Sequence, residues 1–413
     1  MSARHTLAAV LAAVLVLVLA PAARAADPPP PVSAPSALVV EGSTADVAYA
    51  KQPDRRRAIA SATKLMTALL TLERSRPSTE LRAVRYRALP AESKINLQPG
   101  ETMTVADLMR GLLIESANDA AATLATRIGG SEAAFVRAMN ERAKKLGLRD
   151  THYDNPIGLD DPENYSTARD LVRLTLRLRA FEFFRRTVAR EQVTLHSGVR
   201  PRTLENRNGL VRLPVVTGVK TGHTQQAGYV LIGSARKNGI VLISAVLGSP
   251  SVSAREADTR KLFAWAFKLY RRVRAIDPDE VLARAAIRYR RGAELALVVG
   301  DTSRRFVVRR GQRLRRCGLR VPADVEGPIA RGAKLGEVDV CRGKRKIATL
   351  PVVASADVPQ AGLAVRTKDR FTRPWTLLLV VLLSLGATVG LARVRRRGSN
   401  GRRGSRGGEP EAA

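Results

Sequence analysis

Two apolar segments joined by Asn238-Gly239 predict a β-hairpin within this 413-residue chain. The sequence is GYVLIGSARK before the turn and IVLISAVLG after it. Asn-Gly is the strongest short-range signal for a hairpin, because both residues accept the positive φ angles of a tight two-residue turn. Directly after the hairpin, residues 255–273 show the amphipathic pattern of a helix.

Helices are predicted between this hairpin and a strand-like segment near the N-terminus. The segment LVVEGSTADVAYAK alternates like a strand and contains a Gly-Ser turn. The predicted helices cover residues 61–73, 104–114, 118–130 and 131–145. Strands at both ends with helices between them indicate one sheet built from both ends of residues 36–273, with helices packed on it. We therefore expect an α+β domain over these residues.

A second domain is predicted over residues 274–362. Short alternating runs such as RRFVVRRG, GEVDVCRG and KIATLPVV, separated by Gly and Pro, are typical of a small all-β domain. The two cysteines, Cys317 and Cys341, both lie in this region. A disulfide is possible in an oxidising compartment, and two buried thiols are the alternative.

The N-terminus has the pattern of an export signal. Residues 1–4 are basic, residues 7–20 are continuously apolar, and Ala23-Arg24-Ala25 supplies the small residues of a cleavage site. Fourteen apolar residues span about 21 Å, short of the roughly 30 Å hydrocarbon core of a bilayer. We expect a signal peptide over residues 1–25, with an uncleaved anchor as the alternative, followed by a Pro-rich leader at 26–35.

The C-terminal region predicts a membrane anchor. Residues 375–392 (WTLLLVVLLSLGATVGLA) are uncharged and just long enough to span a bilayer, with Trp375 placed for the interface. A basic linker (363–374) precedes them and an Arg-rich, disordered tail (393–413) follows, which disfavours the alternative of a buried core helix. With an export signal, the tail is cytoplasmic. We therefore expect a single-pass protein of the cell membrane, with its domains on the extracytoplasmic side.

The charge of the chain restricts its partners. It has 70 Lys and Arg residues against 37 Asp and Glu, a net charge of +33, which attracts polyanions. Only 4% of the residues are aromatic, which leaves few platforms for stacking bases. Since the chain is also predicted to be exported, we expect membrane phospholipid and anionic wall polymers as its surroundings, and no nucleic acid.

The segment ASATKLMTALLTLE (60–73) places a lysine one turn inside an otherwise apolar helix. Ser61 and Lys64 are three residues apart and so lie on one helix face. Burial lowers the pKa of a lysine, and such a lysine can take the proton of a serine nucleophile. The pair alone is weak support, because Ser234 and Lys237 have the same spacing in a predicted strand, where they point to opposite faces.

Two further stretches carry groups suited to catalysis or binding. Ser116-Ala117-Asn118 lies between two predicted helices, where a hydroxyl and an amide can relay a proton and hold a substrate amide. Ser and Asn also favour helix caps, which is the structural alternative. Lys220-Thr221-Gly222 precedes the hairpin, where the lysine and threonine could bind a carboxylate and the glycine could admit a peptide as an added strand. An ordinary turn is the alternative there.

In order and spacing, Ser-x-x-Lys, Ser-x-Asn and Lys-Thr-Gly together resemble the signature of the active-serine penicillin-recognising enzymes. The longer strings LLIESANDAAATLA, MNERAKKLGLRDTHYDNPIGLDD and GVKTGHTQQAGYVLIGSA are similar to the D-alanyl-D-alanine carboxypeptidases, the low-molecular-mass penicillin-binding proteins. The resemblance implies a β-lactamase/transpeptidase-like α+β domain, with helices on an antiparallel sheet, before the small all-β domain. The implied substrate is a peptidoglycan pentapeptide ending in D-Ala-D-Ala, and β-lactam antibiotics would be covalent inhibitors.

The resemblance implies that three residues carry the chemistry. Ser61 attacks the carbonyl between the two terminal D-alanines and becomes an acyl-enzyme, while Lys64 takes the serine proton. Ser116 passes that proton toward the leaving D-alanine, and water then releases the shortened peptide. The backbone N–H groups of Ser61 and His223 would form the oxyanion hole.

The resemblance also implies substrate-binding groups. Asn118 steadies Lys64 and the substrate amide, and Lys220 and Thr221 hold the terminal carboxylate. Arg255 stands where members often carry an arginine near that carboxylate. The implied substrate-binding residues are Asn118, Lys220, Thr221, Gly222, His223 and Arg255.

The sequence departs from the family pattern at Thr217, where many members have an acidic residue. No spacing of His, Cys, Asp and Glu resembles a zinc site, so we expect no metal and no cofactor. Two alternatives stay open. One is a β-lactamase of the same fold, for which Glu163 is a candidate deacylating carboxylate at an unusual spacing. The other is a catalytically silent protein that binds the cell wall.

Overall fold

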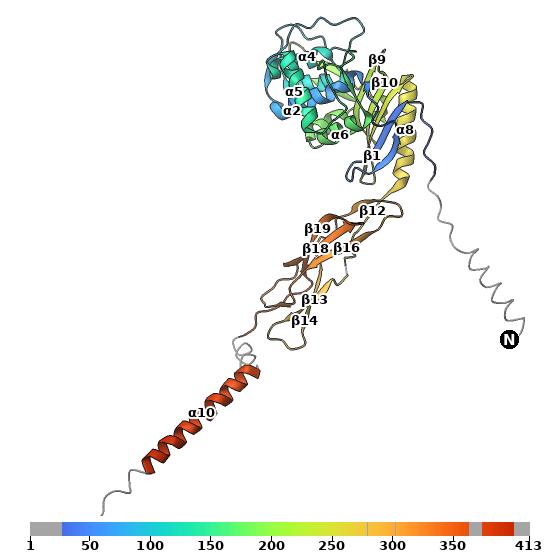
Figure 1. The fold of residues 1–413 in the computed structure, drawn as a ribbon. Helices are drawn as coiled ribbons and strands as arrows, with labels where there is room; N and C mark the ends of the chain where they lie inside the picture. Colours follow the sequence, from blue (N-terminus) through green and yellow to red (C-terminus); the bar gives the residue numbers. More distant parts are fainter. Residues whose placement is uncertain (1–26, 279, 302, 363–373, 400–413) are drawn as a thin grey trace, which may run out of the picture. The chain divides into compact units, whose positions relative to one another are not determined.

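The computed structural model describes residues 27–278, 280–301, 303–362 and 374–399 (Figure 1). The predicted signal peptide (1–25), most of the basic linker and residues 400–413 of the tail lie outside the described residues. The chain divides into two units. The first runs to Arg272 and includes Val307–Gly311, and the second comprises Val273–Phe306 and the chain from Gln312 onward.

The first unit is built on a five-stranded antiparallel sheet in the order β2-β1-β11-β10-β9 (Figure 1). Its strands are β1 (Ser36–Glu41), β2 (Val47–Lys51), β9 (Val216–Thr224), β10 (Gly228–Lys237) and β11 (Ile240–Ser249). The predicted hairpin is confirmed, since β10 and β11 meet at Asn238-Gly239, which have φ angles of 50° and 74°. The N-terminal strand β1 pairs with β11, so both ends of the domain contribute to one sheet, as predicted.

The segment between β2 and β9 is mainly helical, again as predicted. The helices of this unit are η1 (Ala60–Thr63), α2 (Lys64–Arg74), α3 (Val105–Arg110), η2 (Gly111–Glu115), α4 (Asn118–Gly129), α5 (Glu132–Lys145), α6 (Ala168–Leu178), α7 (Glu182–Val188), η3 (Gly209–Arg212) and α8 (Val252–Leu269). The hydroxyl of Ser131 accepts a hydrogen bond from Ala134 N at 3.1 Å and so caps α5 where the sequence predicts its start.

Three predicted helix boundaries differ in the structure. Residues 60–63 form a 3-10 turn before α2 begins at Lys64. The helix capped by Thr104 changes after Arg110 into a single π-helical turn that leads to Ser116. The last predicted helix ends at Leu269, because Tyr270–Val273 form strand β12, which pairs with β15 (Phe306–Arg309).

Both faces of the sheet are covered by other elements, which explains why β1 and β11 are apolar at most positions. On β1, Leu38 and Val40 belong to the core shared with the helices α2 to α6, whereas Ala37 and Val39 pack on the opposite side with Leu262 of α8. The unit therefore has three layers, with α8 on one face of the sheet and helices α2 to α6 on the second face.

Three short two-stranded sheets complete the first unit. They pair β3 (Arg57–Ala58) with β6 (Tyr165–Ser166), β4 (Glu80–Arg82) with β5 (Thr102–Thr104), and β7 (Gln192–Leu195) with β8 (Arg202–Glu205). Between β4 and β5 lies a long irregular loop, residues 83–101, which contributes to the site described below.

The second unit contains a six-stranded sheet in the order β16-β18-β19-β14-β13-β17. Its strands are β13 (Ala283–Ile287), β14 (Glu294–Val299), β16 (Leu314–Arg320), β17 (Asp324–Val325), β18 (Lys334–Arg342) and β19 (Arg345–Ala354). Leu297, Val340 and Val352 are fully buried in its core. Cys317 and Cys341 form a disulfide between β16 and β18, which decides between the two alternatives that the sequence leaves open.

A last helix, α10 (Pro374–Ser399), covers the apolar stretch near the C-terminus. Within the part of the chain that the structure describes, no helix combines the length and the hydropathy needed to cross a membrane. The membrane span expected at residues 375–392 is therefore not shown by the fold.

Candidate active site

Ser61 and Lys64 meet at the start of α2. Ser61 lies within the 3-10 turn, partly exposed, and Lys64 is the first residue of the α-helix and is fully buried. The Nζ of Lys64 lies 3.0 Å from the Oγ of Ser61. The predicted contact between the two side chains is thus present, with the hydroxyl at the surface and the amine beneath it.

Two more oxygen atoms surround the Lys64 amine. Its Nζ donates to Asn118 Oδ1 at 2.6 Å and to the backbone oxygen of Ile157 at 2.5 Å. A neutral amine has two N–H groups for these two acceptors, and its lone pair can then accept the proton of the Ser61 hydroxyl. Burial lowers the pKa of Lys64 to about 7, although Glu92 and Asp119 act in the opposite direction. The site is therefore built to hold this lysine as a base near neutral pH.

Ser116 and Asn118 flank the junction between the π-helical turn and α4. Ser116 has a left-handed backbone, with φ at 67°, and is buried. Among the described residues its hydroxyl makes no hydrogen bond to Ser61 or to Lys64. Asn118 starts α4 and contacts Lys64 directly, so the helix-cap interpretation is wrong for its side chain, which forms no cap hydrogen bond.

Strand β9 brings the Lys-Thr-Gly segment beside Ser61. β9 is an edge strand, and a Cβ placed on Gly222 would lie 3.0 Å from the backbone nitrogen of Ser61. Lys220 is buried and donates to the backbone oxygen of Thr221 at 2.9 Å. Burial and the nearby charge of Lys64 hold the pKa of Lys220 well below its ordinary value. The segment is thus part of a buried strand, and the alternative of an ordinary turn is wrong.

His223 and Arg255 lie at the same end of β9. The exposed imidazole of His223 stacks on the ring of Tyr229, with 4.0 Å between the ring centroids. The buried guanidinium of Arg255 donates to the backbone oxygens of Gly222 (3.1 Å) and Val230 (3.3 Å). Arg255 therefore holds β9 against β10 from the α8 side.

The second Ser-x-x-Lys sequence lies away from this group. Ser234 is buried in β10, where its hydroxyl bonds to Thr217 at 2.8 Å and accepts from Arg179 at 2.8 Å, whereas Lys237 is exposed at the strand end. The predicted opposite orientation of the two side chains is confirmed. Glu163, considered as a deacylating carboxylate, is exposed.

Sequence reasoning missed two partners of the site. One is the backbone oxygen of Ile157, and the other is Glu92, which accepts a hydrogen bond from Asn118 Nδ2 at 2.6 Å. Glu92 lies in the irregular loop between β4 and β5, where no periodic pattern indicates which side chains turn inward.

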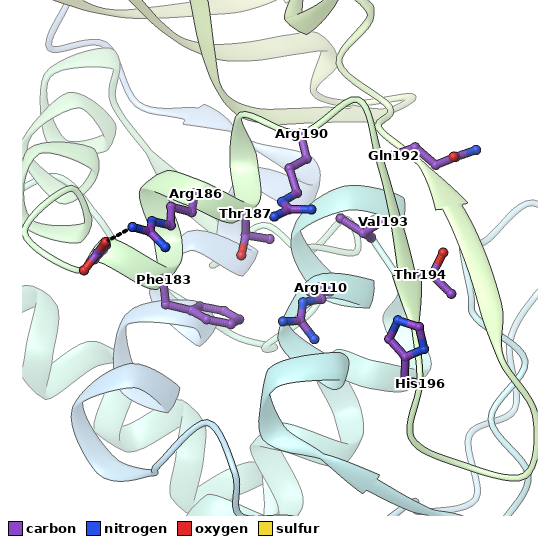
Figure 2. Close-up of a pocket in the computed structure, with 10 residues that line it drawn as sticks. Arg110, Phe183, Arg186, Thr187, Arg190, Gln192, Val193, Thr194 and His196 are labelled. Carbon is purple, nitrogen blue, oxygen red and sulfur yellow. Dashed lines mark ion pairs between the residues drawn. The ribbon is translucent and has the colours of Figure 1, made fainter.

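A pocket of about 620 Å³ lies elsewhere in the first unit, between α3, α7 and β7 (Figure 2). Its lining includes Arg110, Arg186 and Arg190, and none of the predicted site residues. Arg110 is paired with Asp107 at 2.5 Å and Arg186 with Glu182 at 2.6 Å. Two of the three guanidinium groups are thus already neutralised by carboxylates.

A family profile described as D-alanyl-D-alanine carboxypeptidase matches residues 22–251, more than half of the chain. The chain belongs to this family. Among curated relatives, the D-alanyl-D-alanine carboxypeptidase DacF of Bacillus subtilis is 31% identical over 83% of this chain and 90% of its own length. The resemblance inferred from the sequence motifs is confirmed.

Solved structures agree with this assignment. Penicillin binding protein 5 from Haemophilus influenzae is 28% identical, with a TM-score of 0.58 over 80% of this chain and 99% of its own. The Streptomyces K15 DD-transpeptidase is 32% identical, with a TM-score of 0.56 over 58% of this chain and 99% of its own. The chain is therefore a serine-peptidase family member with the mixed α/β fold of these enzymes.

Proposed function

We propose that the chain removes the terminal D-alanine from peptidoglycan stem pentapeptides through an acyl-enzyme on Ser61. The observation that carries the proposal is the 3.0 Å contact between Lys64 Nζ and Ser61 Oγ, with the amine buried and the hydroxyl accessible. A serine hydroxyl needs a base to become a nucleophile. Among the described residues, Lys64 carries the only amine that is hydrogen-bonded to the Ser61 hydroxyl.

In the acylation step, Ser61 Oγ attacks the carbonyl carbon of the penultimate D-alanine and Lys64 Nζ takes the hydroxyl proton. The bond to the terminal D-alanine nitrogen then breaks, and that nitrogen receives the proton through the Ser116 hydroxyl. The backbone N–H groups of Ser61 and His223 stabilise the developing oxyanion. Water subsequently attacks the acyl ester, releases the shortened peptide and restores the Ser61 hydroxyl.

Binding of the peptide uses the free edge of β9. An extended substrate can add to this edge as a strand, and the missing side chain of Gly222 leaves room beside Ser61. The Lys220 amino group and the Thr221 hydroxyl supply hydrogen-bond donors for the terminal carboxylate. The Asn118 amide, bonded to Lys64 through its oxygen and to Glu92 through its nitrogen, is placed to hold a substrate amide.

Activation of Ser61 by Lys64 also explains reaction with β-lactams, which acylate Ser61 and remain attached as slowly hydrolysed esters. A β-lactamase would need a base to hydrolyse that ester quickly, and the exposed Glu163 has no hydrogen bond to Ser61 or Lys64 in the described chain. Slow turnover of a chromogenic cephalosporin with a long-lived covalent adduct would favour the carboxypeptidase.

We place the catalytic unit outside the cytoplasmic membrane. The N-terminal export pattern, the Cys317–Cys341 disulfide and the location of the substrate support this compartment. Anchoring by residues 375–392 remains a prediction from their apolar sequence.

The decisive experiment is the substitution Ser61→Ala in the full chain. Labelling by a fluorescent penicillin and release of D-alanine from a pentapeptide are both expected to disappear, while circular dichroism stays unchanged. Lys237→Ala, in the second Ser-x-x-Lys sequence, is the matched control and should keep both activities. A wild-type protein that neither labels nor releases D-alanine would disprove the enzymatic proposal and leave the silent wall-binding alternative.

A further inference from the structure

Glu92 is a carboxylate of the active site to which neither the motifs nor the proposed mechanism gives a task. Its Oε2 accepts hydrogen bonds from Asn118 Nδ2 at 2.6 Å and from the Tyr86 hydroxyl. Its Oε1 accepts from the backbone nitrogen of Leu89 at 3.0 Å. The carboxylate is therefore held by three donors, one of which belongs to the residue that contacts Lys64.

This arrangement determines which end of the Asn118 amide faces Lys64. An asparagine amide presents an oxygen acceptor at one end and a nitrogen donor at the other. A carboxylate can only accept, so the donor end must face Glu92, and the acceptor end is then directed at Lys64 Nζ, 2.6 Å away. The reverse orientation would set two acceptors against each other at Glu92 and donors against each other at Lys64. Both contacts would be lost, in a region where unpaired polar groups are costly.

Glu92 also affects the charge on Lys64. The carboxylate favours the protonated form of the lysine and therefore opposes the effect of burial on its pKa. Two carboxylates act on Lys64, those of Glu92 and Asp119, and the charge of Lys64 in turn lowers the pKa of the buried Lys220. Asp119 is itself bonded to the backbone nitrogens of Ile95 and Leu97. Of the two carboxylates, only Glu92 also orients a residue that touches the lysine.

Glu92 is poorly suited to act as a base itself. Burial alone would raise the pKa of its carboxyl, but hydrogen bonds from Tyr86, Asn118 and Leu89, with the charge of Lys64, hold it below the ordinary value. Both of its oxygen atoms already accept hydrogen bonds. A carboxylate in this state stays charged at neutral pH and takes protons weakly.

We propose that Glu92 is a positioning residue of this active site. It orients the Asn118 amide toward Lys64, and it places a negative charge one hydrogen-bonded residue away from the Lys64 amine. The proposal rests on the function proposed above, in which Lys64 is the base that activates Ser61.

The two parts of the proposal are separated by two substitutions. Glu92→Gln removes the charge but keeps an oxygen that can accept from Asn118, whereas Glu92→Ala removes both. Glu163→Gln is the matched control, because it removes one carboxylate charge from an exposed position of the same unit. The measurement is the second-order rate of Ser61 acylation by a fluorescent penicillin between pH 5 and pH 9, made on the full chain, with thermal unfolding as the test of folding.

For Glu92→Gln, we expect the acidic limb of the rate profile to move to lower pH by about half to one unit, with the plateau lowered no more than about threefold. For Glu92→Ala, we expect the same shift and a plateau lowered about tenfold or more, because the Asn118 amide is no longer fixed. Glu163→Gln should match the wild type. A loss of folding alone would lower the labelled fraction without moving the limb along the pH axis.

Two results would overturn the proposal. One is a Glu92→Gln profile whose limb coincides with that of the wild type. The other is normal acylation followed by slowed release of the penicilloyl group, which would make Glu92 a deacylation base. The function itself is tested separately: it fails if the wild type is not labelled, whereas the Glu92 proposal fails if the wild type is labelled and the substitutions leave its profile unchanged.

Discussion

A methyl group placed on Gly222 would lie 3.0 Å from the backbone nitrogen of Ser61 and 3.0 Å from the Cβ of Ala60. Such distances are shorter than an ordinary van der Waals contact. β9 and the turn that carries the serine are thus packed directly against each other, backbone to backbone. Their spacing determines how a peptide carbonyl fits between them.

We therefore predict that Gly222→Ala lowers the rate of Ser61 acylation about tenfold, because a displacement of a few tenths of an ångström at the reacting groups is sufficient. The free energy of unfolding should fall by no more than about 1–3 kcal/mol, because the added methyl requires its neighbours to move by only a few tenths of an ångström. The measurement is labelling by a fluorescent penicillin, with thermal unfolding alongside. Gly209→Ala is the control, because its methyl would meet only the flexible carboxylate of Glu256 at 3.1 Å. Equal acylation rates for the two variants would contradict the role of this contact.

The pH dependence of the wild type follows from the burial of Lys64. Burial lowers its pKa to about 7, and the base form increases as pH rises. We expect acylation to rise roughly tenfold per unit below about pH 7 and to level off above it. Stopped-flow labelling across this range measures the profile. A rate that falls between pH 6 and pH 8 would rule out a neutral Lys64 as the base, and Lys64→Ala should lose the labelling.

Much of the fold was predictable because regular helices and strands have periodic patterns of apolar residues in the sequence. The alternation in the N-terminal segment and the Asn238-Gly239 turn predict β1, β2, β10 and β11. The extent of the helix after the hairpin was not predictable from its amphipathic pattern. Residues 270–273 become a strand because β15, more than 30 residues later in the chain, pairs with them.

In the candidate site, too, the local contact could be predicted from spacing in the sequence, whereas not every long-range contact could. Ser61 and Lys64 are neighbours within one turn, so their spacing indicates contact. The other partners of Lys64 come from 54 and 93 residues away, at Asn118 and Ile157. The Ser-x-Asn motif suggests Asn118, but no residue type in the sequence indicates that the backbone oxygen of Ile157 is a partner. Glu92 sits in an irregular loop, where only the folded chain shows which carboxylates face inward.

A buried ion pair supports the loop that carries Glu92. Arg202 donates to both oxygens of Glu101 at 2.8 Å, and both residues are buried. Arg202→Met leaves an unpaired buried carboxylate, and we expect it to lower the free energy of unfolding by about 3–5 kcal/mol. Adding Glu101→Gln should recover most of that loss, because glutamine removes the charge and still accepts hydrogen bonds. Urea unfolding measures both variants.

The exposed ion pair of Arg56 and Asp150 provides the comparison. Arg56→Met should change the free energy of unfolding by less than about 1 kcal/mol.

The pH dependence of the stabilisation by Arg202 and Glu101 has a defined sign. Burial favours the protonated form of Glu101, but hydrogen bonds from Gln98, Val199 and Arg202 outweigh it and hold the pKa below the ordinary value of 4.5. The stabilisation is thus present above pH 4.5 and is lost as pH falls further. Equal losses for Arg202→Met and Arg56→Met would contradict a specific role for the buried pair.

The disulfide offers a test of how independent the two units are. Cys317 and Cys341 are 24 residues apart and link two strands of the second unit, whereas every residue proposed for catalysis belongs to the first. Closing a loop of this length stabilises a fold by about 3 kcal/mol, so Cys317→Ser with Cys341→Ser should lower the unfolding temperature of the second unit. Calorimetry should then show one transition moved and one unmoved. Acylation by a fluorescent penicillin should keep its wild-type rate, and a parallel fall in that rate would mean that the second unit supports the active site.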